Sequence, residues 1–241
     1  MDLLKIETVM KSFGGLTALR NVDLSVSRGQ IKSIIGPNGA GKTTLFNVIS
    51  GFYRPDQGAI HFCGQNITGQ SLECISRLGL ARTFQVVKPF LSMSVLENVM
   101  IGSLSRTSKM LVAKVKAMEV LENIGMAEKA KLLAKNLTLE DRKRLELARA
   151  MATGPKLILL DEVMAGLNPT ETDEFIELIR KIRSEGVTVL LIEHVMQAVL
   201  SLSDEVVVLN YGEKIYEGDT QGVIRDRAVI EAYLGEEYFL T

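Results

Sequence analysis

Short apolar segments recur along the chain, separated by polar or helical segments. Residues 4–9 and 19–26 alternate apolar and polar positions, which is the pattern of half-buried β-strands. Runs with little polar interruption predict further short strands at 31–35, 59–62, 80–85, 157–160, 187–192 and 206–209. Uninterrupted apolar runs are typical of strands buried on both faces of a parallel sheet. The pattern therefore predicts an α/β protein with a mainly parallel sheet.

Between about residues 89 and 154 the strand pattern disappears. Ala, Leu, Lys, Glu and Met recur there at helical spacing. The predicted helices are 95–104, 110–124, 127–137 and 140–151. A further helix is predicted at 43–49, ended by a glycine and a proline. We therefore expect a core of residues 1–86 and 155–241 that is split by a helical subdomain at 87–154.

The composition is that of an ordinary globular chain. Of the 241 residues, 46% are hydrophobic and 24% are charged, which excludes disordered, collagen-like and disulfide-scaffold proteins. The 28 basic and 29 acidic residues give a formal net charge of −1. The chain as a whole is therefore not attracted to nucleic acid or acidic lipid, although a local basic patch is compatible with this balance, and we expect no nucleic-acid partner. Cys63 and Cys74 lack metal-ligand spacing and are expected to be free thiols in a reducing compartment.

The sequence shows no pattern of a signal peptide or a membrane span. The first residues, M-D-L-L-K-I-E, lack the apolar run and cleavage site of a signal peptide. The longest apolar stretch, 187–200, is interrupted by Glu193 and His194 and is too short to cross a bilayer. We therefore expect that, if this protein acts at a membrane, it does so by binding another chain.

The segment G-P-N-G-A-G-K-T matches the pattern G-x-x-x-x-G-K-[ST] of a phosphate-binding loop. Its glycines let successive N–H groups point at phosphate oxygens, and the following helix presents its positive N-terminal end to the same anion. Lys42 can reach the β- and γ-phosphates, and the Thr43 hydroxyl can bind a hydrated Mg²⁺. A chance glycine turn is the alternative, but a buried strand precedes this loop and a helix follows it. The predicted nucleotide triphosphate site comprises Gly36, Pro37, Asn38, Gly39, Ala40, Gly41, Lys42, Thr43 and Thr44.

Two adjacent acids, Asp161 and Glu162, follow the apolar run 157–160. The carboxyl end of a buried strand is where ligands lie in sheets of this kind. Beside a phosphate loop, Asp161 is expected to hold Mg²⁺ through water, and Glu162 to polarise the water that attacks the γ-phosphorus. A solvated turn after the strand is the alternative.

Three further residues carry a weaker signal. His194 follows the run 187–192 as the acids follow theirs, and it is either catalytic or a structural histidine. Gln85 closes the run 80–85 and is either functional or an ordinary exposed polar residue. Phe13 is expected by default to lie in the core.

Together these residues resemble the nucleotide-binding subunit of an ATP-binding cassette (ABC) transporter over essentially the whole chain. The phosphate loop, Gln85, the helical segment, the strand with its two acids, the A-G-L-N motif at 165–168 and His194 occur in the family's order. The resemblance implies a P-loop NTPase (RecA-like) core with an antiparallel β subdomain and an inserted α-helical subdomain. It also implies that Gln85 links Mg²⁺ and the attacking water to the membrane partner, that His194 contacts the γ-phosphate, and that Phe13 stacks on adenine. The motif at 165–168 would lie at the dimer interface.

Several motifs are similar to those of branched-chain amino acid importers. They are K-S-F-G-G-L-T-A-L from residue 11, A-R-T-F-Q from residue 81, S-V-L-E-N-V from residue 94 and A-G-L-N-P from residue 165. Of that system's two sister ATPases, the one that carries A-R-T-F-Q matches better, and lipopolysaccharide-export ATPases are near relatives. The resemblance implies an ATPase that binds MgATP at a head-to-tail dimer interface with a second ATPase subunit, a sister protein or itself.

The same resemblance implies that this ATPase drives integral-membrane permease subunits. A solute-binding protein is then an indirect partner, and the chain is expected in the cytoplasm, on the inner face of the cell membrane. A coupling helix of the permease would dock around residues 85–91.

Other classes fit the sequence less well. A soluble ABC protein that acts on ribosomes or chromosomes usually carries two cassettes or a long coiled-coil insertion, and this sequence has neither. A P-loop kinase needs an acceptor pocket and a lid, and a GTPase needs the guanine-reading motif N-K-x-D. Neither is evident, and the pair of acids with His194 favours hydrolysis by water.

The family's signature, L-S-G-G-Q, is replaced by L-T-L-E-D at residues 137–141. In the family this segment donates backbone N–H groups and a hydroxyl to the γ-phosphate bound on the opposite subunit. Thr138 keeps the hydroxyl, but Glu140 places a carboxylate where a phosphate approaches, which is unfavourable unless it turns away or pairs with Arg142 or Lys143. The alternative is that Thr138, with Asp141 three residues on, simply caps the helix. If the partner is a sister ATPase with an intact signature, we expect two unequal nucleotide sites.

Overall fold

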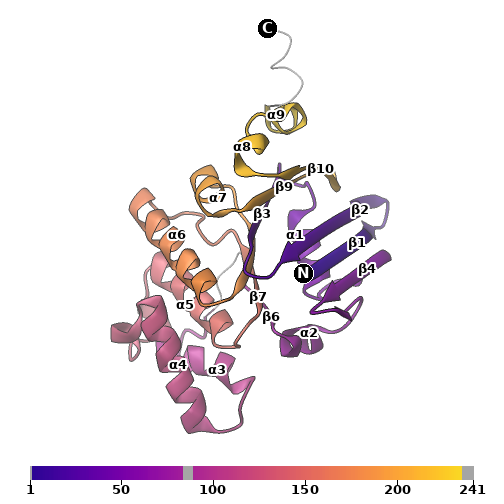
Figure 1. Cartoon of the computed structure of the whole chain (residues 1–241). Helices are drawn as coiled ribbons and strands as arrows, with labels where there is room; N and C mark the ends of the chain where they lie inside the picture. The colour runs from indigo at the N-terminus through magenta and orange to yellow at the C-terminus, as the bar shows by residue number, and fades with distance from the viewer. Residues whose placement is uncertain (1, 84–88, 235–241) are drawn as a thin grey trace.

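The strands of this protein form two sheets, one antiparallel and one mainly parallel, with helices around the parallel sheet (Figure 1). The computed structural model describes residues 2–83 and 89–234. The antiparallel sheet, with β1 (Asp2–Phe13) and β2 (Leu16–Ser27), lies beside the parallel sheet. The helices α3 (Val95–Leu104), α4 (Met110–Ile124) and α5 (Leu139–Met151) lie at the opposite side (Figure 1). This arrangement is the α/β fold with a helical subdomain that the sequence predicts.

The first part of the chain builds the antiparallel sheet. Its strands, in spatial order, are β2 (Leu16–Ser27), β1 (Asp2–Phe13), β4 (Gln57–Phe62) and β5 (Gln65–Asn66). Side chains on the inner face, such as Leu4, Ile6 and Val22, are fully buried. The strands predicted at 4–9 and 19–26 are confirmed and extend further at both ends. Their pairing continues through several irregularities of register, and such bulges interrupt the alternation that marks a strand in the sequence.

The mainly parallel sheet carries the candidate site. Its order is β10 (Glu213–Gly218), β9 (Glu205–Asn210), β3 (Ile31–Ile35), β8 (Thr188–Ile192), β7 (Leu157–Asp161) and β6 (Leu80–Arg82), in which only β10 is antiparallel to its neighbour within the described residues. Every residue of β3, β7 and β8 is buried, as the mainly apolar runs predict, and this includes Lys32 and Ser33 of β3. The carboxyl ends of these three strands meet at one edge of the sheet, and this edge therefore gathers the segments that follow them.

Of the strand predicted at 80–85, residues 80–82 form β6. Gln85 lies outside the described residues.

Helices cover the parallel sheet and fill the segment between β6 and β7. They are α1 (Lys42–Ile49), α2 (Leu72–Leu78), α3 (Val95–Leu104), α4 (Met110–Ile124), α5 (Leu139–Met151), α6 (Pro169–Ser184), α7 (Met196–Leu202), α8 (Thr220–Val223) and α9 (Arg227–Leu234). The predicted helices 43–49, 95–104, 110–124 and 140–151 are confirmed to within one residue at each end. In the described part of the chain, no helix combines the length and the apolarity of a membrane span.

The helix predicted at 127–137 is wrong. This segment forms two short 3₁₀ turns, Ala127–Lys129 and Ala134–Asn136, joined by a turn. Besides short-range hydrogen bonds within the segment, it pairs with the start of α3: the carbonyls of Leu132 and Ala130 accept from the N–H groups of Val95 and Leu96 at 2.8 and 2.9 Å. Tertiary hydrogen bonds therefore replace the helical ones that the spacing suggests.

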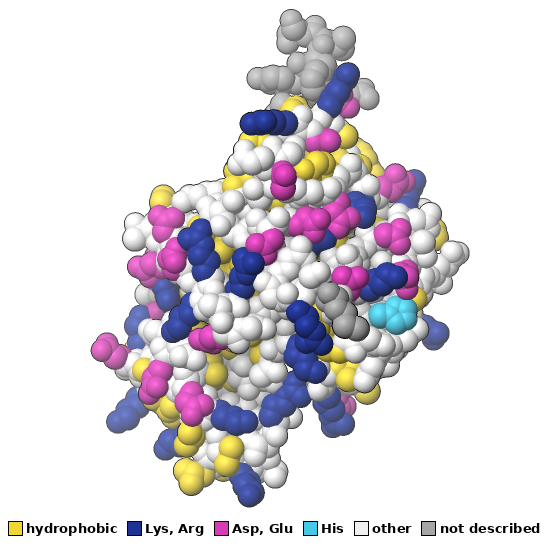
Figure 2. All heavy atoms as spheres, in the orientation of Figure 1, with side chains coloured by type: hydrophobic (Ala, Val, Ile, Leu, Met, Phe, Trp, Pro, Cys, Tyr) yellow, Lys and Arg dark blue, Asp and Glu magenta, His cyan; other side chains and the backbone are white. Residues whose placement is uncertain are grey.

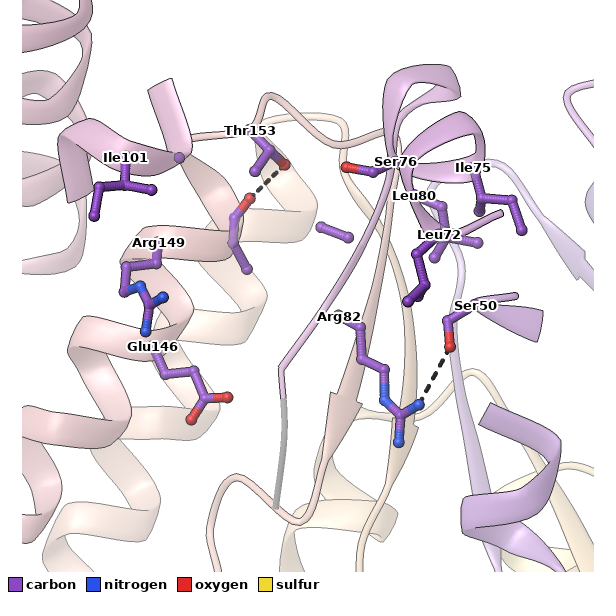
Figure 3. A pocket seen from close by; sticks show the side chains of 13 residues that line it. Ser50, Leu72, Ile75, Ser76, Leu80, Arg82, Ile101, Glu146, Arg149 and Thr153 are labelled. Atoms are coloured by element: carbon purple, nitrogen blue, oxygen red, sulfur yellow. Dashed lines mark hydrogen bonds between the residues drawn. The ribbon is translucent and has the colours of Figure 1, made fainter. Parts of the chain in front are cut away.

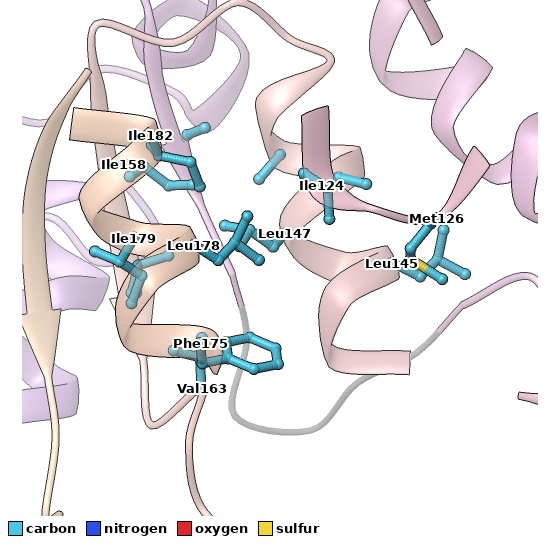
Figure 4. Packing of buried hydrophobic residues seen from close by; sticks show 14 of the residues in the cluster. Ile124, Met126, Leu145, Leu147, Ile158, Val163, Phe175, Leu178, Ile179 and Ile182 are labelled. Atoms are coloured by element: carbon cyan, nitrogen blue, oxygen red, sulfur yellow. The ribbon is translucent and has the colours of Figure 1, made fainter. Parts of the chain in front are cut away.

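A buried apolar cluster joins α5 and α6 to strand β7. Figure 4 shows Phe175 and Leu178 of α6 on the side that faces Leu147 of α5, and Ile158 of β7 belongs to the same cluster. Burial of a large apolar side chain contributes about 1.5–3 kcal/mol to folding. This cluster therefore packs α5 of the helical subdomain against α6 and β7 of the core.

Candidate functional site

The loop at residues 36–41 joins β3 to α1 and requires glycine at two places. Gly36 and Gly41 have φ angles of 147° and 102°. A Cβ at Gly36 would lie 2.1 Å from the carbonyl oxygen of Leu209, and one at Gly41 would lie 2.5 Å from that of Ala18. Only glycine combines this backbone conformation with such close approach, and the resulting curl turns the loop over the N-terminus of α1.

Lys42 is the first residue of α1, and its side chain folds back over the loop. Its Nζ donates hydrogen bonds to the carbonyl oxygens of Gly36 at 2.7 Å and of Pro37 at 2.9 Å. Burial lowers the pKa of Lys42, whereas the nearby carboxylates of Glu162 and Asp161 raise it. The arrangement places a cation and a helix N-terminus at the centre of one loop, which suits a phosphate group.

A cavity of about 470 Å³ opens above this loop. Its lining includes residues 38–44, Phe13, Leu16, Glu162 and Tyr211. Thr43 is exposed and Thr44 half-buried at the start of α1. The structure therefore brings the predicted phosphate loop, Phe13 and one of the two acids to a single cavity.

The expectation that Phe13 lies in the core is wrong. Its side chain is 42% exposed, because β1 ends at this residue and a turn at 14–15 carries the chain away from the sheet. The ring packs edge-on against Tyr53, with 5.1 Å between ring centroids. It is thus held at the margin of the cavity with one side open, a position compatible with stacking on a ligand ring.

Asp161 ends β7 and is almost completely buried. Its Oδ2 accepts a hydrogen bond of 2.9 Å from Arg82 Nη2, while its buried Oδ1 has no hydrogen-bond partner among the described residues. Burial raises the pKa of Asp161, and Arg82 counteracts this. Arg82 also donates to Asn47 of α1 and to Ser50, so the carboxylate is fixed relative to the phosphate-loop helix.

Glu162 follows Asp161 with a φ of 51°, an uncommon conformation for a residue other than glycine. Two backbone contacts hold it there: its N–H donates to Ile192 O at 2.9 Å, and its carbonyl accepts from Lys143 Nζ at 3.3 Å. This turn directs the side chain to His194, whose Nε2 lies 2.6 Å from Glu162 Oε1. The structure thus brings Glu162 and His194, which the sequence analysis names separately, together in one hydrogen-bonded pair.

Glu193 is a buried acid to which the sequence analysis gives no role. Only 1% exposed, it accepts hydrogen bonds from the N–H groups of Met164 at 2.9 Å and of His194 at 3.3 Å. Burial raises its pKa, and these backbone donors together with Lys143 lower it. The carboxylate thus ties the segment after Glu162 to the segment that carries His194. The signal in the sequence is a carboxylate that directly follows the fully buried strand β8.

The sequence resemblance implies ATP hydrolysis at this site, and Glu193→Gln is expected to reduce its rate about tenfold, because the amide turns a donor toward backbone N–H groups. A charge-assisted hydrogen bond is worth roughly 1.5–3 kcal/mol, and 1.4 kcal/mol corresponds to a factor of ten. The measurement is the rate of phosphate release from MgATP, with the exposed Glu185→Gln as control. Equal rates for Glu193→Gln and the control would show that Glu193 does not position His194.

Thr138 directly precedes α5 as its N-cap residue and is not among the described residues that line this cavity. Its Oγ1 accepts from the N–H of Asp141 at 3.2 Å, so the predicted capping role is confirmed. Glu140 does pair with a cation, but the expected partners are wrong: Arg144 Nε donates to it at 2.7 Å. A spacing of four residues places Arg144 on the same helix face as Glu140, which Arg142 and Lys143 do not share. Asp141 pairs with Lys129 at 2.5 Å.

A second hollow, a groove of about 300 Å³, lies between the sheet and the helical subdomain (Figure 3). Leu72 and Ile75 of α2 form one wall, and Ile101 of α3 and Arg149 of α5 form the other. Arg82 lies on the floor of the groove and also binds Asp161. One side chain therefore connects this groove to the acids that follow β7.

Known proteins are similar to this chain in both sequence and fold. A family model described as ABC transporter matches residues 19–165. The chain is 42% identical to the high-affinity branched-chain amino acid transport ATP-binding protein LivG of Escherichia coli (strain K12), over 97% of this chain and 98% of LivG. Its identity to the protein of the same description, BraF, of Pseudomonas aeruginosa is also 42%, with the same coverage. A nucleotide-free ATP-binding cassette from an ABC transporter has a TM-score of 0.90 at 34% identity, over 98% of this chain and all 100% of that one.

Proposed function

The chain belongs to the ABC transporter family of ATP-binding proteins, and from this premise we propose that it is the ATP-hydrolysing subunit of a branched-chain amino acid importer. The observation that carries the proposal is the cavity in which the phosphate loop meets Phe13 and Glu162, with His194 bonded to Glu162. The names of relatives at 42% identity support branched-chain amino acids as the transported class.

Some residues of the site bind ATP, and others transfer the proton. On ATP binding, Lys42 Nζ exchanges the two carbonyl oxygens it now contacts for oxygens of the β- and γ-phosphates, and Phe13 stacks on the adenine. Glu162 accepts a proton from the water that attacks the γ-phosphorus, the bond to the bridging oxygen breaks, and ADP leaves with that oxygen. His194 orients the Glu162 carboxylate and contacts the γ-phosphate.

The chemistry of the donor set fits Mg²⁺, which neutralises phosphate charge when bound. The free, buried Oδ1 of Asp161 is an acceptor that lacks a hydrogen-bond partner among the described residues, and the Thr43 hydroxyl is exposed one residue after Lys42. We propose that Thr43, Asp161 and Gln85 hold the ion, Asp161 through water.

The groove between sheet and helical subdomain is proposed as the docking site of the permease. Its floor residue Arg82 links it to Asp161, and it adjoins residues 85–91 in the chain. The core, 1–86 and 155–241, and the helical subdomain, 87–154, are proposed as the two units that this contact would move relative to each other. The chain would thus act in the cytoplasm, on the inner face of the membrane, with a second ATPase subunit bound head to tail.

A gentle pull-down of the tagged chain from solubilised membranes, with identification of every co-purifying protein, tests this function. The proposal requires a permease among them. A second ATPase with an intact signature would establish a mixed dimer, and its absence would indicate a homodimer. Ribosomal or chromosomal partners without any membrane protein would refute the transporter assignment.

We further propose that the dimer has two unequal sites. The site built on this chain's Lys42 and Glu162 is complete, whereas the site that uses its α5 lacks the signature glycines. Thr138 Oγ1 already serves as a cap, and Glu140 is held in place by Arg144 beside the helix start. This second site is therefore impaired.

Glu140→Gly is expected to raise single-turnover ATP hydrolysis by the dimer about fivefold. Removal of a carboxylate near the γ-phosphate relieves roughly 1 kcal/mol of repulsion. Glu174→Gln is the control, because Glu174 also pairs with Arg144 but belongs to α6 and not to the segment 137–141. An unchanged rate for Glu140→Gly would show that the two sites do not differ in this way.

A further inference from the structure

The first turns of α4 present apolar side chains to solvent. Leu111 is 74% exposed, Met110 61% and Val115 51%, while Ala113, Ala117 and Leu121 on the other face of the helix are buried. Leu111 and Val115 are four residues apart and share one helix face. An apolar patch of this kind on a charged helix marks a surface that binds something.

Basic residues flank this apolar patch in the sequence, and the exposed acids Glu119 and Glu122 follow it on α4. Between residues 102 and 118 the sequence contains Arg106, Lys109, Lys114 and Lys116 and no acid, although the whole chain has a net charge of only −1. Figure 2 shows apolar and Lys or Arg side chains together at the end of the molecule where α3 and α4 lie in Figure 1. Exposed apolar side chains next to several cations match the surface of a bilayer that contains anionic lipids.

The patch adjoins the groove to which the permease is proposed to bind. Arg106 donates to Thr153 O at 2.5 Å and to Ser76 O at 3.1 Å, and both of these residues line the groove. Ile101, which is exposed on α3, also lines it. A permease seated in the groove would hold α4 next to the membrane in which the permease is embedded.

We propose that the start of α4, residues 109–116, binds the anionic headgroup surface of the membrane beside the permease. Leu111 and Val115 enter the boundary between headgroups and acyl chains, and Lys109, Lys114 and Lys116 bind lipid phosphates. A second copy of this chain is a poorer occupant, because two identical basic patches repel each other. The inference rests on the proposed function, which places α4 near the membrane. The choice of anionic lipid as the ligand is based on the side chains of the patch itself.

Sedimentation of the purified full-length chain with lipid vesicles tests the proposal. Vesicles of phosphatidylcholine alone are compared with vesicles that also contain phosphatidylglycerol. We expect binding to the anionic vesicles only, weakened by added salt. The double variant Leu111→Ser/Val115→Ser and the triple variant Lys109→Gln/Lys114→Gln/Lys116→Gln should each bind at least about tenfold more weakly. The matched control is Ile224→Ser, which removes an exposed apolar side chain after α8.

Unchanged thermal unfolding of the variants confirms that they fold. The proposal fails if the wild-type chain does not bind anionic vesicles, or if the double variant binds them as well as the control. It also fails if the double variant still binds anionic vesicles but no longer co-purifies with the permease in the membrane pull-down, because the patch is then a permease contact. If the wild-type chain co-purifies with the permease but does not bind vesicles, this inference is wrong and the proposed function still holds.

Discussion

Glu162→Gln is expected to reduce ATP hydrolysis by at least about 10²-fold while nucleotide binding is retained, because general base catalysis contributes about 10²–10⁴-fold. Glutamine keeps the size of the side chain and can still contact His194 Nε2, now 2.6 Å from Glu162 Oε1, but it does not accept a proton from water. The phosphate loop and Lys42 stay unchanged. ATP should therefore bind and persist in the variant dimer.

Two measurements separate binding from chemistry in this variant. The rate of phosphate release from MgATP reports on hydrolysis, and equilibrium binding of a fluorescent ATP analogue reports on the site. Glu122→Gln, an exposed glutamate on α4, is the matched control. Hydrolysis by Glu162→Gln within a few-fold of the control would show that another group accepts the proton.

Gly36→Ala is expected to abolish ATP binding and to lower the free energy of unfolding by more than about 3 kcal/mol. The φ of 147° is strained for alanine, and the new Cβ would lie 2.1 Å from Leu209 O. Either β9 must move away from β3 or the loop must uncurl. Both changes separate the loop N–H groups from the position of the phosphates.

Gly29→Ala is the control variant: it introduces backbone strain like that of Gly36→Ala but no steric clash. Gly29 has a φ of +72°, a Cβ added there would meet no atom within 4 Å, and the residue lies in a turn away from the cavity. The Gly29→Ala variant should lose only about 1–2 kcal/mol of stability and keep ATP binding. Denaturant unfolding and nucleotide titration of both variants provide the comparison. Retention of ATP binding by Gly36→Ala would refute the requirement for glycine.

Much of the fold follows from local patterns in the sequence. The buried strand β7 is an apolar run in the sequence, and β3 is one with two polar residues inside it, while the glycine and charge patterns that follow these strands identify the loop and the two acids. These features depend on residues that are close in the sequence. Sequence reasoning therefore identifies Lys42, Asp161 and Glu162 without knowledge of the tertiary structure.

The features that the sequence analysis did not predict depend on contacts between segments that are distant in the chain. Arg82 and Asp161 lie 79 residues apart and meet because β6 and β7 are neighbours. Segment 127–137 gives up its predicted helix for hydrogen bonds to the start of α3. Phe13 leaves the core because the strand ends there, and no hydrophobicity pattern marks such an end.

The hydrogen-bond and ion-pair partners of Glu193 and Glu140 likewise could not be predicted from the sequence. The role of Glu193 depends on Met164 and His194, whose N–H groups come from two different segments after parallel strands. Glu140 has cations at several nearby positions, and helix geometry selects Arg144 among them. Charge pairs can thus be anticipated from the sequence, but their partners are fixed by the fold.

ATP-driven transport of branched-chain amino acids is measured most directly as uptake of labelled leucine by cells whose gene for this chain carries Glu162→Gln. Immunodetection and a pull-down first verify that the variant chain is present and bound to its permease. We predict that leucine uptake falls to background in these cells and is normal in cells with Glu122→Gln. Leucine uptake at the wild-type rate in cells that contain only the Glu162→Gln chain would contradict the proposed function.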